Sequence, residues 1–249
     1  MEIIMKEIDC NKYQLDSFVR DLDSLHITLS EKQLKQFMTY YEMLVEWNKV
    51  MNLTAITDFQ DVLKKHFVDS LSLVKAYDLT KSVSIIDIGT GAGFPGIPLK
   101  IAFPNLKVTL LDSLNKRINF LNAVMEEIEL NDINAVHGRA EDYARKGQLR
   151  EQYDLCVSRA VANLATLSEY CLPYVKVGGF FISYKSEKIM EEKTAAEHAI
   201  SILGGKVENQ VEFMIPDSDI YRNLFVIRKC KETPGKYPRK AGTAAKEPL

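Results

Sequence analysis

The stretch Ile86-Asp87-Ile88-Gly89-Thr90-Gly91-Ala92-Gly93-Phe94-Pro95-Gly96 decides the fold of this chain. An apolar run leads into closely spaced glycines, and Pro95 suits the first turn of a helix that follows. Glycine lets the backbone turn sharply and approach a ligand closely, and the N-terminus of a helix favours a negative group. We interpret the stretch as a strand, a ligand-binding loop and the beginning of a helix.

Two glycine spacings fit this loop, and they predict different ligands. Gly89, Gly91 and Gly93 are spaced as in enzymes that bind S-adenosylmethionine, whereas Gly91, Gly93 and Gly96 match the dinucleotide fingerprint. Asp87 favours the first interpretation, because its carboxylate suits the ammonium group of S-adenosylmethionine and would repel a pyrophosphate. The alternative role for Asp87 is to cap N–H groups of the loop.

Three further segments follow predicted strands. Asp112 ends the second strand, where it can bind ribose hydroxyls or cap the next helix. Residues 138–142 follow the third strand, where the backbone either lies beside an adenine or forms a simple turn. Arg159 follows the fourth strand, and its guanidinium suits a phosphate or a guanine edge, the alternative being a structural ion pair.

From about residue 83, short apolar runs alternate with amphipathic stretches. The runs predict seven strands, at 85–88, 108–112, 133–137, 153–157, 180–184, 207–215 and 223–228. The stretches predict helices at 95–103, 115–129, 163–173 and 186–203. This alternation is typical of a mostly parallel sheet with helices on both faces. The last two strands form a hairpin, so seven strands favour the α/β, Rossmann-like Class I methyltransferase fold over the six-stranded dehydrogenase fold.

The chain divides into three parts by pattern. The pattern predicts an N-terminal helical cap at residues 1–80 and the methyltransferase domain at residues 81–230. It predicts a basic tail without a long helix at residues 231–249.

Within the cap, Ser30 and Gln33 form a capping-box pattern at the start of the clearest helix. Two more short helices are expected at 59–67 and 69–77.

Composition describes an ordinary globular protein, with 46% hydrophobic and 27% charged residues and a net charge of −2. The near-neutral charge excludes a broadly basic coat, so a phosphate-binding surface must be local. The four cysteines match no zinc spacing, so we expect no metal. No apolar run approaches the roughly 20 residues of a membrane span, and no secretory signal is visible. We therefore expect a cytoplasmic protein that does not bind membranes.

The strongest local charge is at the C-terminal end. Residues 228–249 include seven basic and two acidic residues, a charge of +5. Arg239 and Lys240 are expected to bind RNA phosphates, and Tyr237 to stack on a base. The alternative is a solvated tail. We predict that replacing Arg239 and Lys240 with alanine weakens RNA binding and leaves cofactor affinity unchanged.

Six segments in order resemble the small-subunit ribosomal RNA methyltransferase G family, also called glucose-inhibited division protein B. They are residues 52–56, 66–71, 87–98, 138–141, 158–162 and 237–242. The resemblance covers nearly the whole chain from the Ser30 helix onward. One departure is Ala244, where the family often has proline.

The resemblance implies S-adenosylmethionine as cofactor and methyl transfer to the position-7 nitrogen of a guanine in 16S ribosomal RNA. The substrate would be the small ribosomal subunit or an assembly intermediate. The resemblance also implies cofactor contacts at Gly89, Phe94, Ala140, Glu141 and Arg159. That nitrogen has a lone pair and no proton, so catalysis needs alignment and exclusion of water but no general base.

Arg159 and His66 are the predicted catalytic residues. His66 either contacts RNA or covers the cofactor, the alternative being a buried structural histidine, and Phe94 packs against either the cofactor or the core. We expect a monomer. Three other functions stay open: a methyltransferase for a protein or small molecule, a nicotinamide-dependent dehydrogenase, and a non-catalytic cofactor-binding module.

Overall fold

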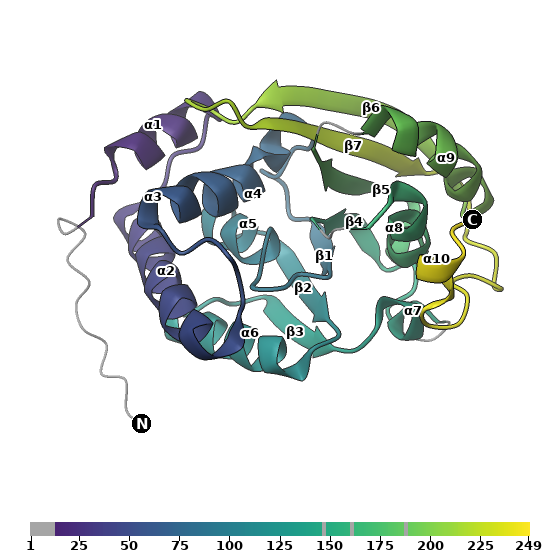
Figure 1. Cartoon of the computed structure of the whole chain (residues 1–249), viewed down its shortest axis with the longest axis horizontal. Coiled ribbons are helices and arrows are strands. Elements are labelled where there is room, and N and C mark those ends of the chain that lie inside the picture. Colours follow the sequence, from purple (N-terminus) through teal and green to yellow (C-terminus); the bar gives the residue numbers. More distant parts are fainter. Residues whose placement is uncertain (1–12, 146–147, 160–161, 187–188) are drawn as a thin grey trace.

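A seven-stranded sheet forms the centre of the computed structural model, which describes residues 13–145, 148–159, 162–186 and 189–249 (Figure 1). The strands are β1 Ser84–Ile88, β2 Lys107–Asp112, β3 Ile133–His137, β4 Tyr153–Ser158, β5 Val175–Lys185, β6 Gly205–Met214 and β7 Tyr221–Lys229. Their order is β3-β2-β1-β4-β5-β7-β6. Strands β1 to β5 pair in parallel, and β7 runs antiparallel to both β5 and β6. All seven predicted strands and the mostly parallel sheet are confirmed.

Side chains of successive residues in a strand point to opposite faces of the sheet, and helices cover both of these faces. The helices of this part are α5 Gly96–Ala102, α6 Asn115–Glu127, α7 Ala140–Tyr143, α8 Leu164–Cys171 and α9 Ile189–Ile202. Ile85 of β1 packs in one apolar cluster, together with residues of α5 and α6. Its neighbour Ile86 packs in a second cluster, with residues of α8 and α9. The sheet is therefore buried on both faces, as the near-continuous apolar strands predict.

The N-terminal helices share the first of these clusters. They are α1 Asp16–Ser24 and α2 Glu31–Met51, and α2 packs against α5 and α6. The predicted capping box is present, since Ser30 accepts from the backbone of Gln33 and the Gln33 side chain accepts from the backbone of Ser30. None of the described helices is both long and apolar enough to cross a bilayer.

Between residues 59 and 75 the structure differs from the two separate helices that we expected. It forms one uninterrupted run: α3 Phe59–Val62, a π-helical turn Leu63–Val68, α4 Asp69–Leu71 and a 3₁₀ turn Ser72–Lys75. The N–H of Asp69 reaches back five residues to the carbonyl of Lys64. Such widened turns are rare and often mark functional sites. Here the turn brings His66 and Asp69 inside, at 8% and 3% exposure.

Candidate active site

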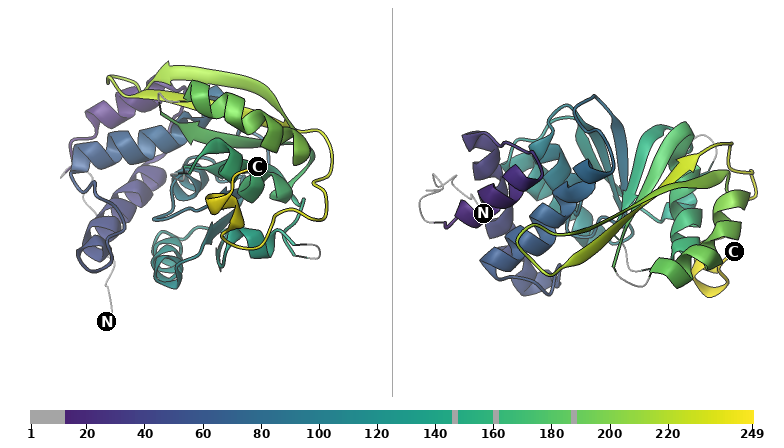
Figure 2. Two further views of the ribbon diagram at one scale, coloured as in Figure 1. Left: turned by 45° about the vertical axis from the view of Figure 1, so that its right-hand side comes forward. Right: turned by 90° about the horizontal axis from the view of Figure 1, so that it is seen from above.

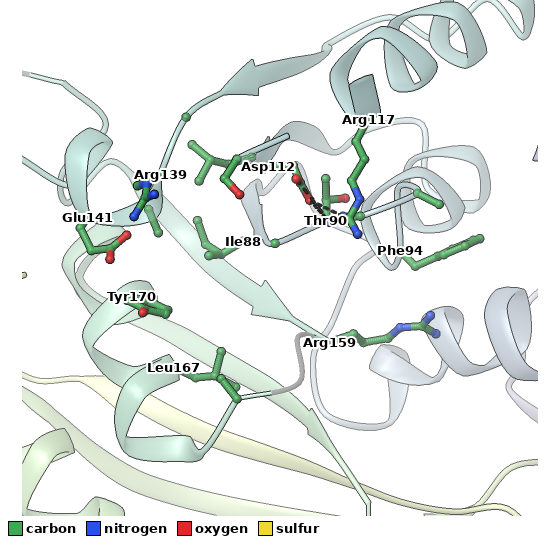
Figure 3. Close-up of a pocket in the computed structure, with 18 of the residues that line it drawn as sticks. Ile88, Thr90, Phe94, Asp112, Arg117, Arg139, Glu141, Arg159, Leu167 and Tyr170 are labelled. Carbon is green, nitrogen blue, oxygen red and sulfur yellow. Dashed lines mark hydrogen bonds and ion pairs between the residues drawn. The ribbon is translucent and has the colours of Figure 1, made fainter. Parts of the chain in front are cut away.

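A cavity of about 780 Å³ lies at the carboxyl ends of the central parallel strands. Its walls come from the loop after β1, Asp112 at the end of β2, the segment after β3, and Arg159 after β4. In Figure 3, Asp112 and Arg117 lie near Thr90, with Arg139, Glu141 and Tyr170 on one side and Phe94 and Arg159 on the other. The strand order reverses between β1 and β4, and open α/β sheets bind ligands at such a point.

The loop conformation needs glycine for two separate reasons. Gly89, Gly91 and Gly93 have φ angles of 71°, 62° and 102°, which side chains disfavour. At Gly93 a Cβ would also lie 2.7 Å from the Tyr40 hydroxyl. Gly96 is needed for packing instead, because its Cβ would lie 2.3 Å from Leu110. Both spacings seen in the sequence therefore have structural causes, and the glycines by themselves do not identify the ligand.

We expected Asp87 to contact the ligand directly, and the structure places its side chain outside the cavity wall. Its side chain is fully buried, and the cavity walls do not include it. Oδ2 accepts hydrogen bonds from the Thr90 hydroxyl at 2.7 Å and the Gly96 N–H at 2.9 Å. Oδ1 has no partner among the described residues, and burial raises the pKa of the carboxyl to about 6. The alternative role, capping of the loop, is the one that the contacts support.

Asp112 joins the loop, the cavity and helix α6. Oδ2 accepts from the Gly91 N–H at 3.0 Å and from Arg117 at 3.1 Å, and Oδ1 accepts from the Leu114 N–H at 2.9 Å. The two backbone contacts fix the carboxylate at the cavity wall. Arg117 is about one-third exposed, so it is the contact that a ribose hydroxyl can replace.

The segment after β3 forms another wall. The carbonyl of Ala140 accepts from the Tyr174 hydroxyl at 2.6 Å, which fixes the start of α7. Glu141 is 7% exposed, and its Oε1 accepts from the Gly242 N–H at 2.8 Å. Residues more than a hundred positions apart therefore meet at this end of the cavity.

The other end is built around a buried carboxylate. Asp69 accepts from Arg159 Nη1 at 2.9 Å and from Arg222 Nε at 2.8 Å. The Arg159 guanidinium lies 5.2 Å from the centre of the Phe94 ring. The His66 ring stacks on the same Phe94 ring, with 4.4 Å between the ring centres and an angle of 18° between the planes. Arg159 and Phe94 are thus held before any ligand binds.

His66 is neutral in this environment. Arg159 Nη2, which can only donate, lies 3.2 Å from His66 Nδ1. The ring proton is therefore on Nε2, 2.8 Å from the Thr54 hydroxyl. Burial, and then the charge of Arg159, lower the pKa of His66 to about 4. Such a histidine is a weak base at neutral pH.

Comparison with known proteins identifies the family. The model of the GidB family, described as rRNA small subunit methyltransferase G, matches residues 33–221. The chain belongs to the rRNA small subunit methyltransferase G family. The prediction made from the six sequence segments is confirmed, and so are the enzyme class and S-adenosylmethionine as cofactor.

Curated relatives cover nearly the whole methyltransferase. "Ribosomal RNA small subunit methyltransferase G" of Lachnoclostridium phytofermentans is 57% identical, over 94% of this chain and 96% of the relative. The protein of the same name from Alkaliphilus metalliredigens is 54% identical, over 89% and 92%.

Solved structures with low sequence identity share the fold. A methyltransferase from Pyrococcus furiosus has a TM-score of 0.55 at 15% identity, covering 79% of this chain and 98% of its own. P. horikoshii TYW2 in complex with MeSAdo has a TM-score of 0.52 at 15% identity, covering 66% and 62%. Both support the Rossmann-like Class I assignment.

The walls of the cavity in this methyltransferase suit S-adenosylmethionine chemically. Asp112 offers carboxylate oxygens for a ribose, and Glu141 offers one for the adenine amino group. Ile88 and Leu167 supply apolar surface for an aromatic ring. Ala160 and Val161, from the family segment at 158–162, lie outside the described residues.

The C-terminal tail of the methyltransferase is docked and forms part of this cavity. Helix α10, Thr243–Lys246, lies beside α8 (Figures 1 and 2). Arg239 Nη2 donates to Glu169 at 2.7 Å, and its backbone N–H donates to the same carboxylate at 2.7 Å. The Thr166 hydroxyl donates to the Ala244 carbonyl at 2.9 Å. Gly242 and Ala245 line the cavity as a result.

This docking corrects the role that we expected for the tail. Tyr237 is 7% exposed and packs in the cluster of α8 and α9, so it is not placed to stack on a base. Arg239 is bound to Glu169, which is 1% exposed. Lys229 is fully buried and pairs with Glu151 at 3.1 Å. Among the three predicted RNA-binding residues, only Lys240 is exposed. Two of the seven basic residues at this end of the chain, Lys229 and Arg239, are therefore used in ion pairs within the fold.

Several residues at the site were not predicted. They are Asp69, Arg222, Glu169, Tyr170, Gly242 and Ala245. Asp69 lies within the family segment 66–71, but no role was predicted for it. Its partner Arg222 is 153 residues away, so no local spacing indicates the pair.

Proposed function

We propose that this chain methylates the position-7 nitrogen of a specific guanine in 16S ribosomal RNA. The observation that carries the proposal is the cavity at the β1–β4 reversal, closed at one end by Arg159 and a neutral His66, in a chain of this family. The substrate is the small ribosomal subunit or an assembly intermediate, and the enzyme acts as a monomer in the cytoplasm. Residues 1–80 serve as a cap, 81–230 as the methyltransferase domain, and 231–249 as the tail.

The cofactor is held along the cavity by residues from four strand ends. Asp112 binds the ribose, and Ala140 and Glu141 face the adenine. The glycine loop approaches the amino-acid end with its backbone, beginning at Gly89. Asp87 holds that loop in shape through Thr90 and Gly96, without touching the ligand.

When bound, S-adenosylmethionine supplies an electrophilic methyl group on a sulfonium. The position-7 nitrogen provides the electron pair of the new N–C bond, while the pair of the broken S–C bond stays on sulfur. The products are a cationic 7-methylguanine and a neutral thioether. No proton leaves the nitrogen, so the reaction does not require a base.

The chain's own contribution is therefore alignment and exclusion of water. Arg159 is the candidate catalytic residue, because it lies at the cavity wall with its guanidinium fixed on Asp69. His66 is a positioning residue, since it accepts from Arg159 and stacks on Phe94. With a pKa of about 4, His66 stays neutral and adds no charge beside the cationic product.

The test is transfer of labelled methyl from S-adenosylmethionine to small ribosomal subunits prepared without this activity, followed by nucleoside analysis. We expect label in 7-methylguanosine. Label in another nucleoside would contradict the assigned acceptor atom. Cofactor binding without label in RNA would favour a protein or small-molecule acceptor, or a non-catalytic module.

A further inference from the structure

A second cavity, of about 740 Å³, adjoins the one described above. The two share His66, Arg159 and Ala162 as lining residues. Arg159 therefore lies between the cavity that suits the methyl donor and a second cavity to which no cofactor contact has been assigned. A methyl acceptor must approach the donor from an adjoining space, so the position of the second cavity matters for the reaction.

Positive charge dominates the walls of this second cavity. Among the described residues, four basic side chains line it, Lys65, Arg159, Lys185 and Arg222, against two carboxylates, Asp69 and Glu192. Each carboxylate is already used by these same cations. Asp69 binds both arginines, and Glu192 binds Lys185 at 2.8 Å. The described part of the cavity wall therefore has an excess of positive charge, which favours an anionic ligand.

The four cations differ in their freedom to meet a ligand. The two arginines are fixed in shape by Asp69, and Arg222 also donates to the Tyr221 carbonyl at 2.9 Å. Lys65 is about two-fifths exposed, and its ion-pair partner among the described residues is Asp61 at the surface, at 2.9 Å. A lysine can redirect its three donors towards a phosphate without a large rearrangement. Lys65 is thus the cation best placed for an incoming phosphate.

The same walls include apolar surface of the kind that a base requires. Ile56 and Ile220 are half-buried there. Tyr184 is 6% exposed, and its hydroxyl donates to the Ser70 carbonyl at 2.7 Å, so the ring is fixed. A cavity with both an apolar wall and mobile positive charge suits a nucleotide taken out of the RNA stack.

We propose that this second cavity binds the target nucleotide, with the guanine towards the Arg159 and His66 wall and its phosphate on Lys65. This inference rests on the proposed function, and it moves the RNA contact from the tail to the mouth of the donor site. Lys185 is a positioning residue here, because it donates to the Ala162 carbonyl at 2.6 Å and shapes the shared wall.

Two variants test the proposal in different ways. Lys65→Gln removes the phosphate contact and keeps a side chain of similar length. Ile56→Trp fills the cavity without removing a charge. Lys49→Gln is the matched control, because Lys49 is an exposed lysine whose ion pair in the described part of the chain is with Glu46, one helical turn away.

The measurements are the KM for small ribosomal subunits, kcat, and the Kd of S-adenosylmethionine by calorimetry. We expect Lys65→Gln to raise KM about three- to tenfold and to reduce the salt slope of binding by about one, with kcat and cofactor Kd unchanged. Ile56→Trp should abolish transfer with cofactor Kd unchanged. Wild-type KM in both variants, or an equal rise in Lys49→Gln, would overturn the cavity assignment and leave the proposed function standing. A changed cofactor Kd would assign the cavity to the methyl donor instead.

A binding experiment separates this inference from the activity. Saturation-transfer NMR with guanosine 5′-monophosphate should show contact to the wild type and loss of contact in Ile56→Trp. If RNA is not methylated but this pattern holds, the proposed function fails while the nucleotide site stands. Equal contact in both proteins would overturn the site.

Discussion

Replacing Arg239 with alanine should weaken cofactor binding, although this residue lies in the tail. The Glu169 carboxylate is 1% exposed and accepts from Arg239 at its backbone N–H, Nε and Nη2. Breaking a buried ion pair typically costs about 3 to 5 kcal/mol. The Arg239 side chain is one-quarter exposed, and water can partly replace it, so we expect about 2 to 3 kcal/mol for tail docking.

The effect reaches the cofactor through Gly242 and Glu141. Release of the tail removes the 2.8 Å hydrogen bond between them and takes Gly242 and Ala245 out of the cavity wall. A hydrogen bond to a charged group contributes about 1.5 to 3 kcal/mol, and about 1.4 kcal/mol is a tenfold change in affinity. We therefore expect the Kd of S-adenosylmethionine to rise about tenfold or more in Arg239→Ala. This reverses the expectation from sequence that cofactor affinity would not change.

Calorimetry with S-adenosylmethionine measures the Kd, and hydrogen exchange over residues 240–249 reports release of the tail. Lys240→Ala is the control, since it removes a neighbouring exposed charge and should leave both readouts unchanged. For Arg239→Lys we expect a Kd and a degree of tail release between those of Arg239→Ala and Lys240→Ala. Lysine keeps the positive charge but lacks the planar pair of N–H donors of the guanidinium. A released tail with an unchanged Kd would refute the reasoning, and an equal effect of Lys240→Ala would show that only surface charge matters.

Two further predictions concern the loop and pH. Gly93→Ala should lower Tm and abolish cofactor binding, because its Cβ would meet Tyr40 and Ile97 at 2.6 to 2.7 Å, whereas Gly91→Ala has its nearest atom at 4.0 Å and should cost only about 1 to 2 kcal/mol of backbone strain. Equal losses in thermal unfolding of the two variants would contradict the steric argument. The pKa of His66 is lowered to about 4 in the fold, so the unfolded chain binds the extra proton first, and stability is lost as pH falls from about 6.5 to 4. Urea unfolding at pH 7 and 4.5 should show about 2 to 3 kcal/mol more loss in the wild type than in His66→Gln. The raised pKa of Asp87 acts in the opposite direction in both proteins and cancels in this comparison, and parallel pH profiles would argue against a neutral buried His66.

The sequence alone determined the sheet, the loop and the family. Strand periodicity is local, so apolar runs such as 85–88 and 108–112 could be assigned without knowing their neighbours. The capping box at Ser30 and the positive-φ glycines are also local, because a cap or a turn depends on residues within a few positions. The predicted number of strands, seven, then favoured the methyltransferase fold over the six-stranded dehydrogenase fold.

Only the tertiary structure decided what the charged residues do. Asp69 meets Arg222, and Glu169 meets Arg239, across 153 and 70 residues, and no spacing in the sequence indicates either pair. The basic tail was therefore interpreted as an RNA-binding arm, although its arginine has a buried partner. A charged residue at the surface and a charged residue in a buried ion pair look alike in a sequence. They differ in whether groups distant in the sequence pack around the charge and exclude water from it.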